Sequence, residues 1–318
     1  MSAMAIELEP MALESAEGYL LRALTANGAN VRDLLALRRG TARRHISPED
    51  ARLYESLTGV AASWFSCRIP TAVAGERWSE LDLFGLRWRS DWTVRALYGQ
   101  VCPECLADKH FARLEWDLMA FVACPVHRLL LVDRCAECGR SLMPHRPAIE
   151  VCRCGAFISR PQDNLQVADP LILAWCSWLS ATVQAAIQQA PLPASPFEGL
   201  IGLSADGIYR LAICLGGGTR ALRGAQLNSP GPWLATSAVD VVLQQGLAAL
   251  AELECGQAPS IKLLPSSGDS LAEQAYRGVT LADRNAAATL RRRLRLPSRW
   301  RTSRKLLHRQ GDLFEGWS

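Results

Sequence analysis

The 318-residue sequence shows little of what is typical of segments that direct a chain to a membrane or to the secretory pathway. Its start, MSAMAIELEPMALESAEG, has no basic stretch followed by an apolar one, so we expect neither a signal peptide nor a transit peptide. The longest apolar run, from Leu171 to Ile187, is interrupted by serines, Thr182 and Gln184, which favours a buried amphipathic helix over a membrane span. We therefore expect a cytoplasmic protein without a membrane partner, whose thiols stay reduced.

The sequence also lacks a convincing array of strands and any repeat of solenoid period. Apolar residues make up 49% and charged residues 21%, which is typical of a globular chain. We predict a mainly α fold in three parts. These are a helical N-terminal domain with a helix-turn-helix over residues 1–99, tandem structural zinc fingers with little β structure over 100–160, and a helical C-terminal domain with a basic tail over 161–318. Residues 66–100, rich in Trp and Arg, are expected to be irregular.

Residues typical of helix starts and ends occur in both the N-terminal and the C-terminal parts of the chain. Ser47 and Pro48 suit an N-cap and a first helical position, and Gly59 ends that helix before a second short one. This is the outline of a helix-turn-helix, although many small helical domains share it. Other helices are predicted over 14–25 and 31–38, after caps at Asp169 and Ser204, from Thr236 or Ser237 to about Glu254, and at capping boxes formed by Ser270 with Glu273 and Thr280 with Asp283.

Against these absences, the sequence concentrates eight possible metal ligands between residues 102 and 154. They form four close pairs: Cys102/Cys105, Cys124/His127, Cys135/Cys138 and Cys152/Cys154. A gap of one or two residues lets a tight turn place two donors on one metal ion, and two pairs complete a tetrahedral site. We predict two structural Zn²⁺ ions, one held by the first two pairs and one by the last two. Sequential pairing closes shorter loops than the cross-braced alternative.

Other roles for these thiols fit the sequence less well. A catalytic zinc site keeps three protein ligands and a water molecule, and neither the H-x-E nor the H-E-x-x-H motif is present. The usual iron–sulfur spacings are absent, and a disulfide framework conflicts with a reducing compartment. A thioredoxin-type motif would need a βαβ context. We therefore predict no catalytic residue.

For the aromatic, cysteine and histidine residues outside the ligand pairs we expect structural roles and no metal binding. The long gap of the first finger is expected to form its own small core from Phe111, Leu114, Trp116, Leu118 and Phe121. The remaining cysteines should be buried and act as small apolar residues; these are Cys67, Cys176, Cys214 and Cys255. His110 and His145 are expected at the surface.

Positive charge gathers at the end of the chain, although the net charge is only +4. The segment RRRLRLPSRWRTSRKLLHR, from 291 to 309, contains nine Lys or Arg residues and no acid. It is either a solvated helix end and tail, or a contact for phosphates or an acidic partner. We favour the contact, whose candidate residues are Arg291, Arg292, Arg293, Arg295, Arg299, Arg301, Arg304, Lys305 and Arg309.

The Cys/His block resembles the paired zinc motifs of the TniQ/TnsD family, the target-selection proteins of heteromeric transposons. That family shows CPxCL, then R-x-x-W, CPxH and C-x-x-CG-x-x-L. This chain has CPECL at 102–106, Arg113 with Trp116, CPVH at 124–127, and CAECG at 135–139 followed by Leu142. The N-terminal ESAEGYLLRALTANG is similar to the family's opening segment, with Gly18-Tyr19 in place of the usual Ser-Trp.

The resemblance covers about residues 10–160, and it implies a protein without catalytic activity of its own. It implies a helical N-terminal region with a helix-turn-helix, tandem zinc fingers and a helical C-terminal region. Family members bridge a target DNA, or a CRISPR effector complex already on its target, to an AAA+ transposition regulator. CRISPR-linked members resemble head-to-tail homodimers. For this chain the resemblance implies a bacterial adaptor that is associated with the nucleoid when engaged.

Two other functions are open at this point. An enzyme, such as a zinc-supported nuclease, would need clustered carboxylates or an open metal site, and the sequence shows neither. A zinc-finger and helix-turn-helix DNA-binding regulator unrelated to transposition would share the closed metal sites and the basic terminus. Genes for a transposase and an AAA+ ATPase beside this one would favour the adaptor.

Overall fold

The structure is a computed structural model of the chain, and it describes residues 4–29, 48–61, 63–73, 80–89, 93–95, 99–143, 146–159, 165–200, 202–217 and 235–299. Several predictions lie outside these residues. They concern the helix over 31–38, the N-cap Ser47, the surface histidine His145, and the basic residues Arg301, Arg304, Lys305 and Arg309.

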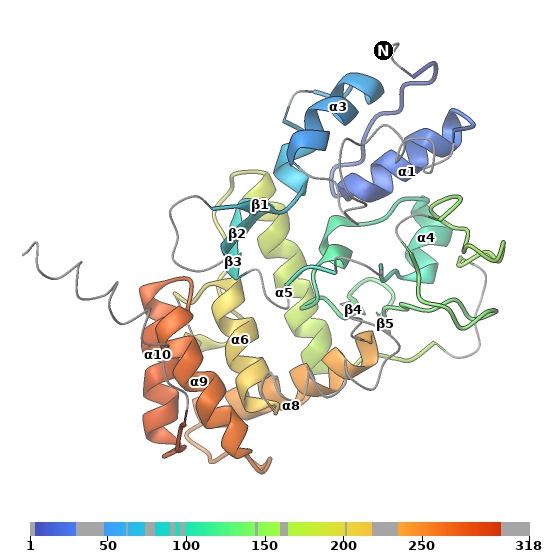
Figure 1. Cartoon of the computed structure of the whole chain (residues 1–318). Helices are drawn as coiled ribbons and strands as arrows, with labels where there is room; N and C mark the ends of the chain where they lie inside the picture. Colours follow the sequence, from blue (N-terminus) through green and yellow to red (C-terminus); the bar gives the residue numbers. More distant parts are fainter. Residues whose placement is uncertain are drawn as a thin grey trace, which may run out of the picture.

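Helices dominate the described residues, and strands are few (Figure 1). The α-helices are α1 (Ala16–Ala26), α3 (Pro48–Thr58), α4 (Pro103–Lys109), α5 (Pro170–Ile187), α6 (Ala205–Leu215), α8 (Thr236–Glu254), α9 (Pro265–Arg277) and α10 (Leu281–Arg293). The 3₁₀ helices are η1 (Ser66–Arg68), η2 (Leu114–Asp117) and η3 (Glu198–Leu200). The strands are β1 (Thr71–Ala72), β2 (Glu80–Leu83), β3 (Leu86–Arg89), β4 (Ala123–Cys124) and β5 (Leu129–Leu130). The predicted mainly α fold with little β structure is confirmed.

The N-terminal helices enclose a small core of their own. α1 begins after Ser15, whose hydroxyl accepts a hydrogen bond from the backbone of the first turn at 3.0 Å. The ring of Tyr19 on α1 lies 5.9 Å from that of Phe65, and Tyr54 on α3 packs against the same Phe65 at 5.8 Å. These aromatic contacts hold α1 and α3 together, because large rings bury much apolar area.

The predicted helix-turn-helix is not seen in the described residues. α3 ends at Thr58, and Gly59 turns the chain with a φ of 75°, as expected of a residue that closes a helix. The described residues from 60 to 65 then form turns and no second α-helix, and only the short η1 precedes β1. The glycine signal identifies the end of a helix but does not specify the structure of the next segment.

Residues 66–100, expected to be irregular, contain a three-stranded antiparallel sheet in the order β1–β2–β3. Phe84 and Gly85 join β2 to β3 with φ angles of 62° and 75°, which suits a tight two-residue hairpin. Leu83 and Trp88 are buried on one side of it. The prediction was wrong because no strand here exceeds four residues, which is too short for a clear alternating pattern.

α5 runs through the middle of the molecule (Figure 1) and is a core helix. Among the described residues, α5 is the one helix that is long and apolar enough to cross a membrane. It packs against α8 and β4, and Asp169 caps its start by accepting a 2.8 Å hydrogen bond from Leu171 N, as predicted. Its buried residues belong to the main core and make up 39% of the helix, so burial inside the protein accounts for part of its apolar character.

The Cys/His block shares this core and does not form a separate one. The buried side chains of its long gap belong to the same apolar cluster as α5, α6 and α8; they are Leu114, Trp116, Leu118 and Phe121. Phe111 is only partly buried. Trp175 on α5 donates its indole N–H to the carbonyl of Ala120 at 2.8 Å. The expected independent core is a misprediction, because α5 covers this segment.

The C-terminal helices pack closely. A Cβ added at Gly246 on α8 would lie 1.8 Å from the carbonyl oxygen of Ala212 on α6, so glycine lets the two helices approach. The predicted capping box at Thr280 and Asp283 is present. The one predicted at Ser270 is wrong, because Ser270 lies inside α9, which begins earlier at Pro265. Proline at the first helical position was the stronger signal.

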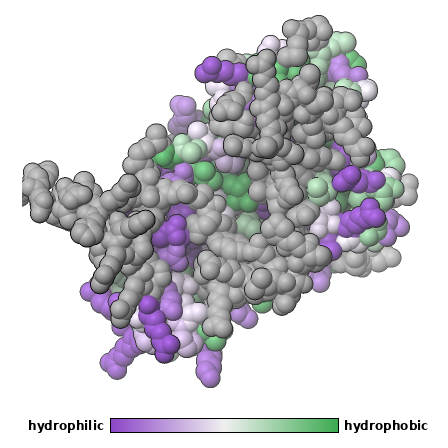
Figure 2. All heavy atoms as spheres, in the orientation of Figure 1, coloured by the Kyte–Doolittle hydropathy of each residue, from purple (hydrophilic) through white to green (hydrophobic). Residues whose placement is uncertain are grey.

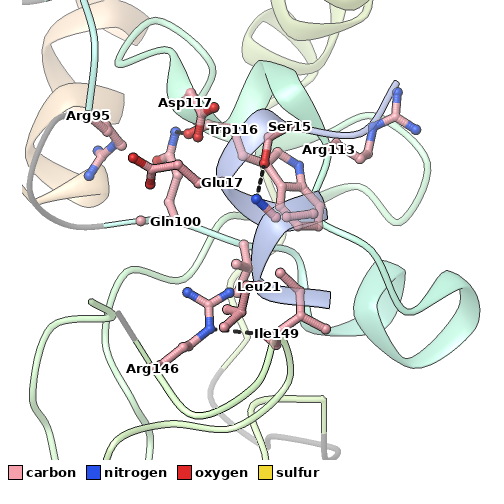
Figure 3. Close-up of a pocket in the computed structure, with 14 residues that line it drawn as sticks. Ser15, Glu17, Leu21, Arg95, Gln100, Arg113, Trp116, Asp117, Arg146 and Ile149 are labelled. Carbon is pink, nitrogen blue, oxygen red and sulfur yellow. Dashed lines mark hydrogen bonds between the residues drawn. The ribbon is translucent and has the colours of Figure 1, made fainter. Parts of the chain in front are cut away.

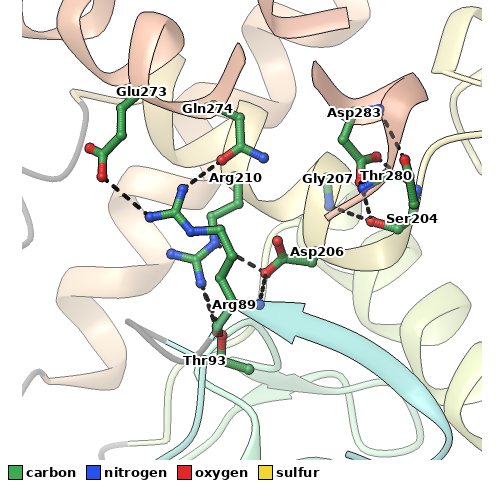
Figure 4. Close-up of polar contacts among 10 residues, drawn as sticks. All are labelled: Arg89, Thr93, Ser204, Asp206, Gly207, Arg210, Glu273, Gln274, Thr280 and Asp283. Carbon is green, nitrogen blue, oxygen red and sulfur yellow. Dashed lines mark hydrogen bonds and ion pairs between the residues drawn. The ribbon is translucent and has the colours of Figure 1, made fainter. Parts of the chain in front are cut away.

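A buried polar network joins β3 to the C-terminal helices (Figure 4). Arg89 on β3 donates to Gln274 at 2.9 Å and forms an ion pair with Glu273 at 3.4 Å, both on α9. Asp206 and Arg210 on α6 form an ion pair at 3.1 Å in the same network. Burial raises the pKa of Asp206, while Arg210 opposes that rise. Breaking a buried ion pair leaves an uncompensated charge, so the network holds β3 and α9 in one arrangement.

Candidate metal centres

The first candidate site gathers Cys102, Cys105, Cys124 and His127. Cys102 is the N-cap of α4 and Cys105 lies in its first turn, whereas Cys124 ends β4 and His127 lies in the turn before β5. The four ligand atoms lie within 4.8 Å of one another, and the three cysteines are buried. The start of a helix therefore faces a hairpin turn across the site.

The second candidate site gathers Cys135, Cys138, Cys152 and Cys154, again with ligand atoms within 4.8 Å of one another. Its cysteines lie on turns, and a glycine in the left-handed region comes after each pair; these are Gly139 and Gly155, with φ of 66° and 91°. Cys154 is exposed. The two groups match the predicted sequential pairing, and the cross-braced alternative does not describe them.

The spacing of the donors fits tetrahedral coordination. A Zn–S bond of about 2.3 Å places the sulfurs of a tetrahedral site about 3.8 Å apart. Two sulfur pairs of the second group are each 3.8 Å apart, and the Sγ atoms of Cys105 and Cys124 are 3.5 Å apart. Each group supplies four protein donors, so each could hold one ion in a closed shell.

The thiols perturb one another strongly. Hydrogen bonds from Cys102 and Cys105 lower the pKa of Cys124 to about 2, and contacts with its neighbours raise the pKa of Cys105. In the second group a backbone hydrogen bond lowers the pKa of Cys154 to about 7, while burial raises that of Cys152 to about 12. Thiols this close together are all deprotonated only when a bound cation offsets the repulsion between the thiolates. Both groups therefore suit a divalent ion.

The turn after His127 holds a feature that sequence reasoning missed. Arg128 takes the place in this turn that Gly139 takes in the second group. Its backbone N–H donates to the carbonyl of Cys124 at 2.8 Å, matching the 2.9 Å bond from Gly139 to Cys135. The φ of Arg128 is 59°, a left-handed conformation that costs a residue with a Cβ roughly 1–2 kcal/mol. Arginine has no turn preference that could have signalled this.

The basic candidates surround the end of α10. Arg291, Arg292 and Arg293 form its last turn, and Arg295 and Arg299 come after it. All of these except the half-buried Arg291 are exposed. Successive helical residues point about 100° apart, so the three arginines encircle the helix end and do not line one face. Positive charge there also complements the helix macrodipole.

The single cysteines divide into two kinds. Cys176 on α5 and Cys214 on α6 are buried as predicted, and burial raises the pKa of each thiol to about 12. Cys67 and Cys255 are exposed, so their predicted burial is wrong. Cys67 lies in a short 3₁₀ turn and Cys255 comes after the end of α8, places where one side of the chain faces solvent. His110 is 65% exposed, as predicted.

A small cavity lies where α1 meets the residues around α4 and η2 (Figure 3). Its volume of about 40 Å³ has room for a few water molecules. Two buried arginines, Arg95 and Arg146, line it, and burial lowers the pKa of each to about 10. Burial also raises the pKa of Asp117 in the same wall. Its size suits internal hydration and not a cofactor or substrate.

Residues 5–131 match the family model TniQ. This part of the chain is a TniQ domain. The predicted resemblance is thereby confirmed, and the protein is associated with DNA transposition, in which TniQ is a non-catalytic accessory domain. No curated protein matches the chain.

The TniQ match divides the two metal groups. It contains α1, α3, the three-stranded sheet, α4 and the whole first group. It ends at Leu131, before the first cysteine of the second group, whereas we expected the resemblance to extend to about residue 160. The second group and helices α5 to α10 therefore lie outside the matched TniQ region.

Proposed function

We propose that this chain is a non-catalytic adaptor for target-site selection in DNA transposition. It links target DNA, directly or through a CRISPR effector complex bound there, to an AAA+ transposition regulator. The TniQ match over residues 5–131 is the observation that carries the proposal. The four-donor metal groups and the exposed arginines of α10 support it, because they supply shape and charge for binding.

In this proposal both metal groups hold Zn²⁺ as a structural ion. Thiolate and imidazole in tetrahedral sets of four are the donors that zinc prefers, and both groups supply such a set. Bound zinc would supply the positive charge that lets the thiols ionise. The first group then fixes the start of α4 against the β4–β5 hairpin. The second group then closes the turns that come after the TniQ region.

The basic end of α10 is the proposed contact with phosphates or with an acidic face of a partner. Hydrophilic side chains gather at the end of the molecule where α9 and α10 lie (Figure 2). The exposed arginines there are Arg292, Arg293, Arg295 and Arg299. A phosphate contact releases condensed counterions, so binding should weaken steeply with salt.

A pull-down tests the adaptor role directly. The full chain is used to capture the AAA+ ATPase and any effector complex encoded beside its gene, with and without target DNA. We expect the ATPase to be retained, and retention to increase with DNA or with the DNA-bound effector. Failure to retain the ATPase both with and without target DNA would contradict the adaptor role. Sedimentation of the chain alone tests the homodimer that the family resemblance implies.

The basic contact needs a charge-matched control. Replacing Arg291, Arg292 and Arg293 by Ala should weaken binding and flatten its dependence on salt. A second triple variant removes Arg128, Arg140 and Arg153, which are exposed near the metal groups and carry the same total charge. Equal effects of the two variants would assign the loss to net charge alone. A binding affinity that does not change with salt concentration would contradict a phosphate contact.

A further inference from the structure

His127 presents its two ring nitrogens to different partners. Nδ1 faces the thiols of the first group, and it lies 3.5, 3.3 and 3.7 Å from the Sγ atoms of Cys102, Cys105 and Cys124. Nε2 lies 3.0 Å from Oδ2 of Asp108. The imidazole therefore stands between the sulfur donors and a carboxylate.

The carboxylate comes from the helix that also supplies a sulfur ligand. Cys105 and Asp108 are three residues apart on α4, so they lie on the same face of the helix. α4 thus offers a thiol in its first turn and a carboxylate one turn later, on either side of the ring of His127. The Asp108 side chain is 58% exposed and that of His127 is 20% exposed.

We propose that Asp108 is a positioning residue for the first metal site. A neutral imidazole has one N–H and one lone pair. The carboxylate of Asp108 can only accept, so it holds the proton on Nε2 and leaves the lone pair of Nδ1 for the metal ion. Metal-bound histidines commonly donate their other N–H to such a group, which fixes the ring and raises its basicity. The inference rests on the proposed zinc occupancy of the first group.

The second group contains no histidine, and it serves as the internal reference for a test. The full chain is loaded with two zinc ions and titrated with a chromophoric chelator. Asp108→Ala should weaken one of the two sites by about 10- to 100-fold and leave the other unchanged. Asp108→Asn keeps an acceptor oxygen without the charge and should restore part of the loss. Glu104→Ala removes the same charge from the same helix but keeps the contact between Asp108 and His127, and should leave both sites unchanged.

A spectroscopic readout separates positioning from a general loss of stability. In zinc-loaded wild type, a long-range ¹H–¹⁵N spectrum should show the proton of His127 on Nε2 and in slow exchange with water. In Asp108→Ala that proton should exchange fast while the far-UV circular dichroism stays unchanged.

Three results would overturn the inference. Metal bound through Nε2 would reverse the assignment of the two nitrogens. Equal zinc affinity of wild type and Asp108→Ala would make the contact a surface ion pair only, and the zinc assignment would stand. A wild-type chain that binds no zinc at the first group would overturn the zinc assignment and the inference together.

Discussion

The two metal groups gather the same number of donors by different means. The first lies inside the TniQ match, uses the start of α4 and a β-hairpin, and has three buried cysteines. The second lies outside the match and is built from turns closed by glycines. Cys135 and Cys152 of that group are buried, whereas Cys138 is partly exposed and Cys154 exposed.

From this difference we predict that a metal's contribution to stability depends on what its ligands are attached to. β4, which carries Cys124, packs directly against the core helix α5. Metal loss at the first group should therefore reach the main core. Metal loss at the second group should open turns that are already open to solvent on one side. Substitutions at matched places in the two groups test this contrast.

The largest effect is expected for Cys105→Ser. Removing this buried ligand should release one zinc ion and leave polar groups inside the main core, because structural zinc binding is coupled to folding. We expect the free energy of unfolding to fall by more than about 4 kcal/mol, which is a large part of the stability of an ordinary domain. Thermal unfolding followed by circular dichroism measures it, and a transition close to that of wild type would show that the first group is dispensable for the core.

A smaller effect is expected for Cys135→Ser. This variant should also lose one zinc ion, but unfolding should stay local to residues 134–143 and 146–159 while the helical signal is retained. Hydrogen exchange read by mass spectrometry, together with zinc content, checks both points. Loss of the helical signal would make the two groups equivalent. Retention of both zinc ions would count against the second site.

The turns after the ligand pairs offer a finer test. Gly139→Ala places a Cβ in the left-handed region, where nothing lies within 4 Å of it, so it should cost about 1 kcal/mol from backbone strain alone. Arg128→Gly, at the matching place in the first group, should change little. Relief of strain there is offset by the greater freedom of glycine in the unfolded chain. Denaturant titration of the zinc-loaded proteins measures both, and equal losses would contradict the matched roles of the two positions.

The last effect, which depends on pH, concerns a carboxyl outside both groups. Burial and then the charge of Asp169 raise the pKa of Asp240 to about 6. The folded chain therefore holds this proton more tightly than the unfolded chain, so stability is present below about pH 4 and is lost as pH rises through about 6. Asp240→Asn should be more stable than wild type at pH 7 and equal to it near pH 4. Ligand protonation affects both proteins alike, so a difference between them that does not change with pH would refute the assignment.

Local chemistry explains what the sequence could predict. The caps at Asp169, Ser204 and Thr280 form because a short polar side chain meets free N–H groups within its own turn. The ligand pairs could also be predicted from the sequence, because a Cys-x-x-Cys or Cys-x-x-His turn brings its donors together without contacts from the rest of the fold.

The missed features depend on distant contacts. The hairpin of β2 and β3 is held by packing and by the reach of Arg89 to α9, more than 180 positions away along the chain. The merging of the Cys/His block with the main core depends on α5 lying over it, which no spacing within 102–154 reveals. The contact between Asp108 and His127 has a local signal only after the helix of α4 is known, since residues three apart share a helical face.

In the proposed adaptor the chain holds two separate, closed zinc sites. Zinc-edge X-ray absorption of the purified full chain, combined with metal analysis, tests it most directly. We expect two zinc ions per chain, each four-coordinate, with the seven sulfur donors and one imidazole nitrogen of the two groups divided between them. One zinc ion per chain, or an oxygen ligand from bound water in either shell, would contradict it.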